Sequence, residues 1–412
     1  MKDKSNKTYF EDALSEILLH AKKTGTEKIS VIESSGRFLS SDIIADINIP
    51  SFDNSAMDGY AVMHDDLKNA SRDFPVKLIV IDEIKAGDDF SKSKLKAGCA
   101  IRIMTGAGIP SGADSVIQVE DTFESEGNVF VSRSVSRHEN IRFAGEDIQS
   151  GKKVFSMGCR IGSAELGLLV SIGLRNVEVH RRPLVKILST GDEIADMEKS
   201  LKPGMIRNSN AYTLMSEVSK CGAVHDYLGI ARDDRDEIRN KIIGGLTGDI
   251  IITSGGVSMG QYDFVREALV EAGFSIIIEN IMMKPGKPLV FGVKDNILFF
   301  GLPGNPVSTM ISFMEFVRPA ILKMMGAIRI SKPVVKAILA EPVSKKAGRR
   351  HFIRAVFFIK NGALHVSTTG PQGSGILKSM SDANCLIILP EESGDIEEGS
   401  DVDIQLIRHE EI

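Results

Sequence analysis

The residues with the most chemical content form a glycine-rich loop within residues 249–266. The sequence there reads DIIITSGGVSMGQYDFVR, an apolar run that breaks at Gly255 and Gly256 and then resumes as a helical pattern. This pattern predicts a strand, a loop and the start of a helix. At the carboxyl end of a strand in an open parallel sheet, bare backbone N–H groups and a helix N-terminus favour an anion. We therefore expect the chain to handle a phosphate or another oxyanion.

Three better-known loops can be compared with this one. A Walker loop requires a lysine that is missing, because Gln261 and Tyr262 follow Gly260, and the glycines are misplaced for a dinucleotide fingerprint. Residues 256–260 (GVSMG), in contrast, match the nucleophile elbow of serine hydrolases, in the strand-to-helix context that the elbow requires. An elbow needs a later histidine, and the later histidines lie in a stretch predicted to be a separate β-rich unit: His351, His365 and His409. A serine hydrolase is thus an alternative that the sequence disfavours but leaves open.

Polar side chains also gather where the predicted strands of this region end. They fall in residues 189–193, 232–234, 254–263, 284–288 and 301–306. Singly, Asp233 and Asp234 can cap a helix, and Asp192 with Glu193 can form an ordinary acidic turn. Together, carboxylates that can hold Mg²⁺, lysines that can neutralise phosphate and a glycine loop would share one edge of a parallel sheet. The sequence predicts that they converge on a cleft.

An alternation of strands and helices must position these residues. Strands are predicted at 184–188, 224–230, 250–253 and 297–300, and helices at 211–220, 234–244 and 264–272. Such repetition implies a parallel sheet covered on both faces.

The flanking regions have other patterns. An amphipathic stripe over residues 9–23 predicts a helix closed by Gly25, and short alternating runs between 48 and 148 predict a β-rich unit with a hairpin around Gly127 and Asn128. Residues 163–172 are helical in pattern, and packing of this helix on the N-terminal one would make the β-rich unit an insertion into a helical linker domain. From residue 331 onward short β runs return, with a turn at residues 361–362, which predicts a terminal β-barrel or sandwich.

Composition narrows the classes of function. The net charge is −5 and the pI about 6.0, with scattered basic residues, so no nucleic-acid partner is expected. No signal-like start and no apolar run of about 18 residues is present, so we expect a cytoplasmic protein without a membrane partner. The four cysteines are far apart and the eight histidines form no helical pair. Carboxylates are therefore the expected metal ligands, and they favour magnesium.

Seven motifs in order resemble those of the molybdopterin molybdenumtransferases, the family that includes the bacterial enzyme of molybdenum cofactor synthesis and the E domain of gephyrin. The resemblance covers nearly the whole chain. Its motifs are residues 54–61 (NSAMDGYA), 102–107 (RIMTGA), 145–147 (GED), 189–193 (STGDE), 253–258 (TSGGVS), 284–288 (KPGKP) and 302–308 (LPGNPVS).

The resemblance implies an elongated homodimer of multidomain α/β plus β class. Its domains would be a helical linker and dimerisation domain (1–48 and 149–180), an inserted β-rich domain (49–148), a parallel α/β molybdopterin-binding domain (181–328) and a C-terminal β-barrel (329–412). It also implies an activity: insertion of molybdate into adenylylated molybdopterin with Mg²⁺, and release of AMP to give the active cofactor. A separate molybdopterin adenylyltransferase is an implied partner. A tungstate-inserting paralogue and a non-catalytic scaffold of the same fold are the alternatives.

The family's functional residues carry over to matching positions. The catalytic set would be Asp58, Thr105, Arg142, Asp147, Glu193, Asp233, Asp263, Lys284 and Lys287. The substrate-binding set would be Thr190, Gly191, Asp192, Ser254, Gly255, Gly256, Ser258, Pro303, Gly304, Asn305, Pro306 and Arg350. Within these sets we expect Glu193 and Asp233 to hold Mg²⁺, and the two lysines to neutralise phosphate or molybdate. The resemblance also implies that the active site lies between the α/β domain of one subunit and the β-rich second domain of the other. Asp58 and Asp147 would therefore reach the cleft from the partner subunit.

Overall fold

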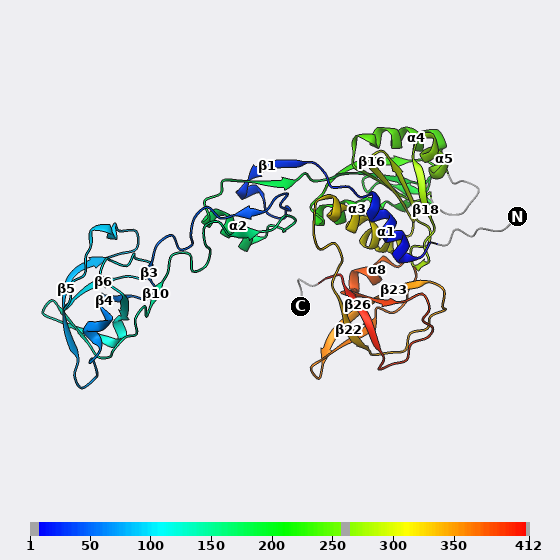
Figure 1. Cartoon of the computed structure of the whole chain (residues 1–412). Coiled ribbons are helices and arrows are strands. Elements are labelled where there is room, and N and C mark those ends of the chain that lie inside the picture. The colour runs from blue at the N-terminus through cyan, green and yellow to red at the C-terminus, as the bar shows by residue number, and fades with distance from the viewer. Residues whose placement is uncertain (1–7, 257–263, 409–412) are drawn as a thin grey trace.

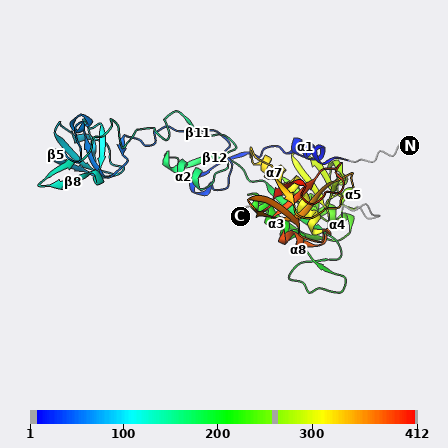
Figure 2. The same cartoon turned by 90° about the horizontal axis from the view of Figure 1, so that it is seen from below.

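The computed structural model describes residues 8–256 and 264–408, and it shows an elongated molecule (Figure 1). A β-rich domain forms one end, a small linker domain the middle, and an α/β domain with a β-barrel beside it the other end. A view turned by 90° shows the same separation of the β-rich domain from the α/β domain (Figure 2). Within the described residues no helix is long and apolar enough to cross a membrane.

The β-rich domain is a mixed sheet with strand order β7-β4-β6-β5-β9-β8. Its strands are β4 (Gly59–Val62), β5 (Val76–Ile84), β6 (Cys99–Ile103), β7 (Ser115–Gln118), β8 (Thr122–Ser125) and β9 (Asn128–Val131). The predicted hairpin is confirmed between β8 and β9, where Glu126 and Gly127 both have positive φ (52° and 75°), as a tight primed turn requires. Two short strands, β3 (Asn54–Ser55) and β10 (Ile141–Arg142), pair where the chain enters and leaves this domain.

The linker domain is built mainly from strand pairs. In it β1 (Thr26–Ser30) pairs with β12 (Asn176–His180), and β2 (Ile43–Ile44) pairs with β11 (Lys153–Phe155). The chain leaves the linker after β2 and returns at β11. Helix α2 (Ser163–Ser171) packs here, and the Glu165 carboxylate closes its N-terminus by accepting the N–H of Gly162 at 2.9 Å.

The expected packing of the N-terminal helix on α2 is not observed. Helix α1 (Phe10–His20) instead lies in the core of the α/β domain, where the Phe10 ring contacts Phe316 and Phe352 with ring centroids 5.1 and 5.4 Å apart. Its apolar stripe is thus covered by the α/β domain and the barrel, while α2 buries Leu169 in the separate core of the linker. An amphipathic pattern shows that a helix has a partner, but it does not say which partner.

The α/β domain contains a sheet with strand order β16-β13-β17-β21-β20-β18. Its strands are β13 (Leu184–Thr190), β16 (Val224–Ala231), β17 (Ile250–Ser254), β18 (Ser275–Glu279), β20 (Val290–Lys294) and β21 (Ile297–Leu302). The first four in that order are parallel, but β20 runs antiparallel to both neighbours. The loop that precedes β20 therefore lies at the same edge as the carboxyl ends of the parallel strands.

Helices cover both faces of this sheet, as predicted. The helices α3 (Ser209–Lys220), α6 (Pro306–Ser312) and α7 (Arg318–Met324), with a π-helical turn at Phe313–Val317, pack with α1 on one face. The helices α4 (Arg235–Gly244) and α5 (Phe264–Glu271) cover the other face (Figure 1). A short parallel pair, β14 (Ile194–Ala195) and β15 (Ile206–Arg207), lies between β13 and α3 in sequence.

The C-terminal domain is a closed barrel, because β23 pairs with both β24 and β25. Its elements are β22 (Val334–Leu339), β23 (Arg350–Lys360), β24 (Ala363–Thr368), α8 (Leu377–Asp382), β25 (Cys385–Leu389) and β26 (Asp401–Leu406). The predicted turn at Asn361 and Gly362 joins β23 to β24, and both residues have positive φ. Strand β19 (Met283–Lys284), from the α/β domain, pairs in parallel with the start of β23 and so joins the two domains.

Candidate functional site

A cavity of about 640 Å³ lies at the carboxyl ends of β13, β17 and β21, and we call it the strand-end cavity. The convergence predicted for the ends of the parallel strands is therefore observed. The predicted residues that line it are Thr190, Gly191, Glu193, Asp233, Ser254, Gly255, Gly256, Gly304, Asn305 and Pro306.

Three predicted residues of this region do not line the strand-end cavity, and others lie outside the described residues. The Asp192 carboxylate accepts the backbone N–H of Asp233 at 3.4 Å, and Pro303 is buried with its carbonyl accepting the hydroxyl of Thr309. Asp192 and Pro303 therefore bond to neighbouring parts of the chain, a backbone N–H and a threonine hydroxyl. Arg350 lies elsewhere, as described below. Ser258 and Asp263 fall outside the residues that the structure describes.

The glycine loop approaches β13 so closely that side chains are excluded. Gly255 has φ +98° and Gly256 has φ +68°. A Cβ on Gly255 would lie 2.7 Å from the Thr190 carbonyl oxygen, and one on Gly256 would lie 2.9 Å from Thr190 Oγ1. The Thr190 hydroxyl is itself buried, and it has no hydrogen-bond partner among the described residues. An unpaired buried hydroxyl in the wall of a cavity is a group that a bound ligand can satisfy.

Asparagine side chains hold the loops of this cavity together. The Asn210 amide donates to Ser254 Oγ and to the Gly304 carbonyl, both at 2.8 Å, and so ties the first turn of α3 to the ends of β17 and β21. Asn208 caps α3: its Oδ1 accepts from the Ala211 N–H at 3.3 Å and from Ser189 Oγ at 3.0 Å. Neither residue was predicted as part of the site, although an Asn just before a predicted helix, here the one at 211, is the ordinary signal of an N-cap.

Glu193 and Asp233 are the carboxylates available to a metal in this cavity. Both are exposed, and neither carboxylate has a hydrogen bond or ion pair to a described residue. The described residues contain no group of three or more His, Cys, Asp or Glu suited to enclose a metal ion. Mg²⁺ commonly binds one or two protein carboxylates together with waters and substrate phosphates, so these two residues fit Mg²⁺ that arrives with a phosphate.

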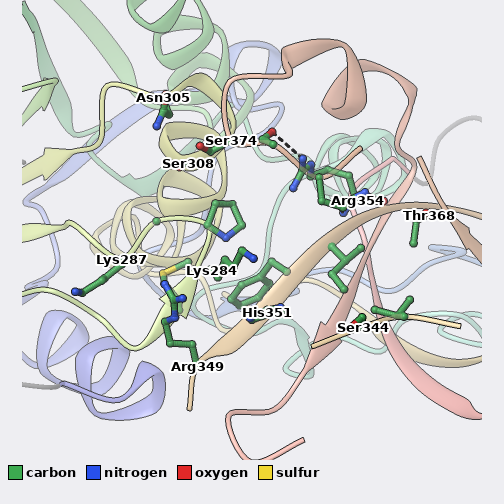
Figure 3. A pocket seen from close by; sticks show the side chains of 18 of the residues that line it. Lys284, Lys287, Asn305, Ser308, Ser344, Arg349, His351, Arg354, Thr368 and Ser374 are labelled. Atoms are coloured by element: carbon green, nitrogen blue, oxygen red, sulfur yellow. Dashed lines mark hydrogen bonds between the residues drawn. The ribbon is translucent and has the colours of Figure 1, made fainter. Parts of the chain in front are cut away.

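A second cavity, of about 600 Å³, lies between the α/β domain and the barrel, and we call it the lysine cavity (Figure 3). Its lining contains the predicted Lys284 and Lys287 together with Arg349 and Arg354. The described residues that line it include no Asp or Glu. Asn305 lines both this cavity and the strand-end cavity, so the two adjoin.

Among the described residues, the basic groups of the lysine cavity have no acidic partner that would neutralise them. The Arg354 guanidinium is 1% exposed and donates to neutral acceptors, Ser379 Oγ at 3.1 Å and the Gly373 carbonyl at 2.9 Å. Burial lowers the pKa of Arg354 to about 10. The guanidinium is therefore still charged at neutral pH, and a buried charge of this kind calls for a counter-ion.

His351 shares this cavity as a neutral group. Its side chain is 8% exposed and lies beside Lys284 in Figure 3. Burial, and then the positive charge of Lys284, lower the pKa of His351 to about 4. The imidazole can thus donate or accept a hydrogen bond without adding charge at neutral pH. The sequence suggested a role for His351 only in a hydrolase, and no histidine lines the described part of the strand-end cavity.

Arg350 does not line the lysine cavity. Its Nη1 lies 2.5 Å from the Glu11 carboxylate, its Nε lies 3.3 Å from that of Glu391, and its guanidinium lies 4.5 Å from the centre of the Phe10 ring. Arg350 thus joins α1 to the barrel, and its neighbour Arg349 lines the cavity. Successive side chains of a strand point to opposite sides, which places residues 349 and 351 on one side and Arg350 on the other.

The predicted residues of the β-rich domain lie far from both cavities within one chain. The Asp58 carboxylate accepts the backbone N–H of Thr105 at 2.7 Å and its hydroxyl at 2.8 Å, which lowers the pKa of Asp58. Arg142 lies on β10, and Asp147 lies in a hollow with Gly145 and Glu146. The linker domain separates these elements from the α/β domain, where Glu193 lines the strand-end cavity (Figure 1). A single chain does not bring the two sets together.

The arrangement defines a class of protein with a two-part N-terminal region, an α/β domain with a cavity at its strand ends, and a terminal barrel. Family models match each part, the "MoeA N-terminal region (domain I and II)" at residues 8–173, the "probable molybdopterin binding domain" at 186–323 and the "MoeA C-terminal region (domain IV)" at 336–407. These matches confirm the predicted fold class.

Full-length relatives identify the family. Molybdopterin molybdenumtransferase of Haemophilus influenzae is 38% identical over 94% of this chain and 95% of its own length, and that of Bacillus subtilis is 36% identical over 95% and 92%. The crystal structure of the molybdopterin biosynthesis MoeA protein of Pyrococcus horikoshii has a TM-score of 0.84 and 30% identity, and covers 97% of this chain and 100% of the other. The chain belongs to the molybdopterin molybdenumtransferase family and is a transferase of molybdenum cofactor biosynthesis.

Proposed function

We propose that this chain inserts molybdate into adenylylated molybdopterin in a Mg²⁺-dependent reaction that releases AMP. The observation that carries the proposal is the pair of adjoining cavities of different character that meet at Asn305. Among the described lining residues, the strand-end cavity offers the carboxylates of Glu193 and Asp233 and the unpaired Thr190 hydroxyl, with Arg207 as its cation, whereas the lysine cavity offers cations and no carboxylate. A substrate that carries a phosphate and must receive an oxyanion needs both environments side by side.

The strand-end cavity is the proposed site of the adenylyl phosphate. The Gly255 N–H already donates to the Leu302 carbonyl at 3.0 Å. The backbone N–H of Gly256 and those in the first turn of α3, together with the unpaired Thr190 hydroxyl, can donate to phosphate oxygens. Glu193 and Asp233 would hold Mg²⁺, which when bound neutralises phosphate charge as the anhydride is cleaved. Both carboxylates accept nothing from the described protein, so their oxygens are free for this role.

The lysine cavity is the proposed site of the molybdate substrate. Lys284 and Lys287 act as point charges, and the Arg354 fork can offer a paired donor to two oxygens of a tetrahedral anion. Arg354 is held by Ser379 and Gly373 and has little freedom to lose on binding. Side chains of this kind do not distinguish molybdate from tungstate, so tungstate insertion is the alternative within this proposal.

A second copy of the chain is proposed to complete the site. Asp58, Thr105, Arg142 and Asp147 cannot reach Glu193 within one elongated chain, whereas a homodimer can place one chain's β-rich domain over its partner's strand-end cavity (Figure 1). The substrate would come from a separate adenylyltransferase in the cytoplasm.

The direct test is AMP release from adenylylated molybdopterin with Mg²⁺, measured without oxyanion and with molybdate, tungstate or phosphate. We expect release that depends on molybdate or tungstate and does not respond to phosphate. Absence of release with every oxyanion, from a folded protein, would favour the non-catalytic scaffold. Release that is blocked by a serine-directed phosphonate and needs no oxyanion would favour the hydrolase.

A further inference from the structure

A third cavity, of about 530 Å³, lies where the linker, the α/β domain and the C-terminal segment meet, and we call it the junction cavity. None of its described lining residues lines either of the other cavities. Its basic residues come from four separate parts of the chain: the linker, the C-terminal end of α3, the segment from α7 to the barrel, and the last described residue. They are Arg160, Lys220, Arg318, Lys332 and Arg408.

The junction cavity has a large excess of positive charge. Glu217 is the carboxylate among its described lining residues, and Lys220 already pairs with it at 2.8 Å. Arg318 donates through Nη1 to the Ile330 carbonyl at 2.8 Å. Among the described residues, the side chains of Lys332 and Arg408 have neither a hydrogen-bond partner nor an ion-pair partner.

The fold holds two of these cations away from water. Burial lowers the pKa of Lys332, and the charge of Arg318 lowers it further; burial also lowers the pKa of Arg318. The buried Glu315 nearby offers little compensation, because burial raises its pKa to about 7 and it already accepts a hydrogen bond from Gln405 at 2.8 Å. Half-buried like charges without a counter-ion are unfavourable, and an anion in the cavity would relieve their repulsion.

The remaining wall of the cavity is apolar and adaptable. Met310, Met314 and Met380 line it together with Ile407. Thioether side chains repack easily around ligands of irregular shape. The cavity thus combines a positively charged side that can bind an anion with a wall that can contact the apolar part of a ligand.

We propose that the junction cavity binds a small organic phosphate, with the phosphate against Lys332, Arg318 and Arg408 and the organic part against the methionines. This site is separate from the proposed transferase site. Because Arg160 belongs to the linker and Lys332 to the connection between the α/β domain and the barrel, the ligand joins three parts of the molecule. Its binding stabilises the folded arrangement by mass action.

The test is isothermal titration of the full-length protein with inorganic pyrophosphate, without Mg²⁺, as the simplest multiply charged phosphate. Arg408→Glu is the main variant, because Arg408 is exposed and its replacement does not disturb a core. Arg329→Glu is the matched control, since Arg329 is also exposed, lies near Lys332 in sequence and does not line the cavity. Lys332→Met and Lys284→Met complete the set.

We expect saturable binding to the wild type and to Arg329→Glu, with affinity lower by at least about tenfold in Arg408→Glu and Lys332→Met, as expected for loss of a charge-assisted contact. If the lysine cavity also binds pyrophosphate, the wild type should show two binding events, and Lys284→Met should keep the one at the junction cavity. Equal affinity in Arg408→Glu and the wild type would overturn the proposal, as would complete loss of binding in Lys284→Met. A third result would also overturn it: no binding to any form, with a dimer that dissociates in Arg408→Glu but not in Arg329→Glu. In that case the anion that faces Arg408 would be a carboxylate of a second copy of this chain.

Discussion

The strand-end cavity and the lysine cavity lie at the same edge of one sheet and have similar volumes, yet they are built in different ways. The strand-end cavity is made by the ends of parallel strands, and its charged lining residues include the exposed carboxylates of Glu193 and Asp233. The lysine cavity is made by docking the barrel against the loop before β20, and its charged groups are cations. One sheet edge can thus present exposed carboxylates and a cluster of cations in two adjoining cavities. In the proposed function this separation keeps the phosphate and its Mg²⁺ apart from the oxyanion.

The largest expected effect comes from Arg354→Met, which removes the buried charge of the lysine cavity. Met fills most of the space of the arginine side chain. The two groups that accept hydrogen bonds from Arg354, Ser379 Oγ and the Gly373 backbone carbonyl, are neutral. We expect the KM for molybdate to rise by about 100-fold, the scale for losing a buried charge-assisted contact, with a folded protein. Steady-state AMP release at varied molybdate measures this, with circular dichroism as the fold control. An unchanged KM for molybdate would remove Arg354 from the oxyanion site.

The next largest effect is expected from Glu193→Gln, which removes a negative charge from the strand-end cavity. The variant keeps the shape of the side chain and removes a hard anionic ligand. We expect the Mg²⁺ concentration for half-maximal activity to rise by about 10-fold or more, with an unchanged KM for molybdate. Asp192→Asn is the matched control, because Asp192 lies beside Glu193 but does not line the cavity. An equal effect of the two substitutions would mean that general negative charge, and not metal ligation, matters.

Asn305→Ala tests the point at which the cavities meet. Because Asn305 lines both, we expect the KM for molybdate and that for adenylylated molybdopterin to rise together, each by about threefold to tenfold, the range for one neutral hydrogen bond. Ser308 lines the lysine cavity but not the strand-end cavity, so Ser308→Ala should change only the KM for molybdate. A change confined to one substrate in Asn305→Ala would contradict a shared boundary.

The smallest expected effect is a pH dependence of protein stability, and it comes from His351 in the lysine cavity. The pKa of His351 falls from about 6.5 in the unfolded chain to about 4 in the folded one, so folding favours the neutral imidazole. The stability from this group is fully present above about pH 6.5 and is lost as pH falls towards 4. Thermal unfolding of His351→Gln should therefore depend less on pH between 6.5 and 4 than that of the wild type. Parallel curves for the two proteins would show that His351 is not buried as described.

The sequence predicted the strand-end cavity better than the lysine cavity, for a physical reason. The ends of parallel strands share an edge, so a strand pattern alone brings Thr190, Glu193, Asp233 and Gly255 together. The lysine cavity depends on the pairing of β19 with β23, a contact across the sequence that no local pattern encodes. For the same reason Arg350 was placed in the site, although its contacts with Glu11 and Glu391 turn it away.

The helices illustrate the same limit. Periodicity predicted α1 and α2 and their apolar faces, but not that α1 joins the α/β core while α2 stays in the linker. The prediction of a parallel sheet was likewise incomplete, because the antiparallel direction of β20 cannot be read from its composition.

The most direct test of the central claim, that the two cavities divide the reaction between phosphate and oxyanion, is equilibrium binding of molybdate and of AMP with Mg²⁺ to the wild type, Arg354→Met and Glu193→Gln. The account predicts that Arg354→Met loses molybdate binding and keeps that of AMP, and that Glu193→Gln loses Mg²⁺-dependent AMP binding and keeps that of molybdate. If both variants lost both ligands, or each lost the other's ligand, the division between the strand-end cavity and the lysine cavity would be contradicted.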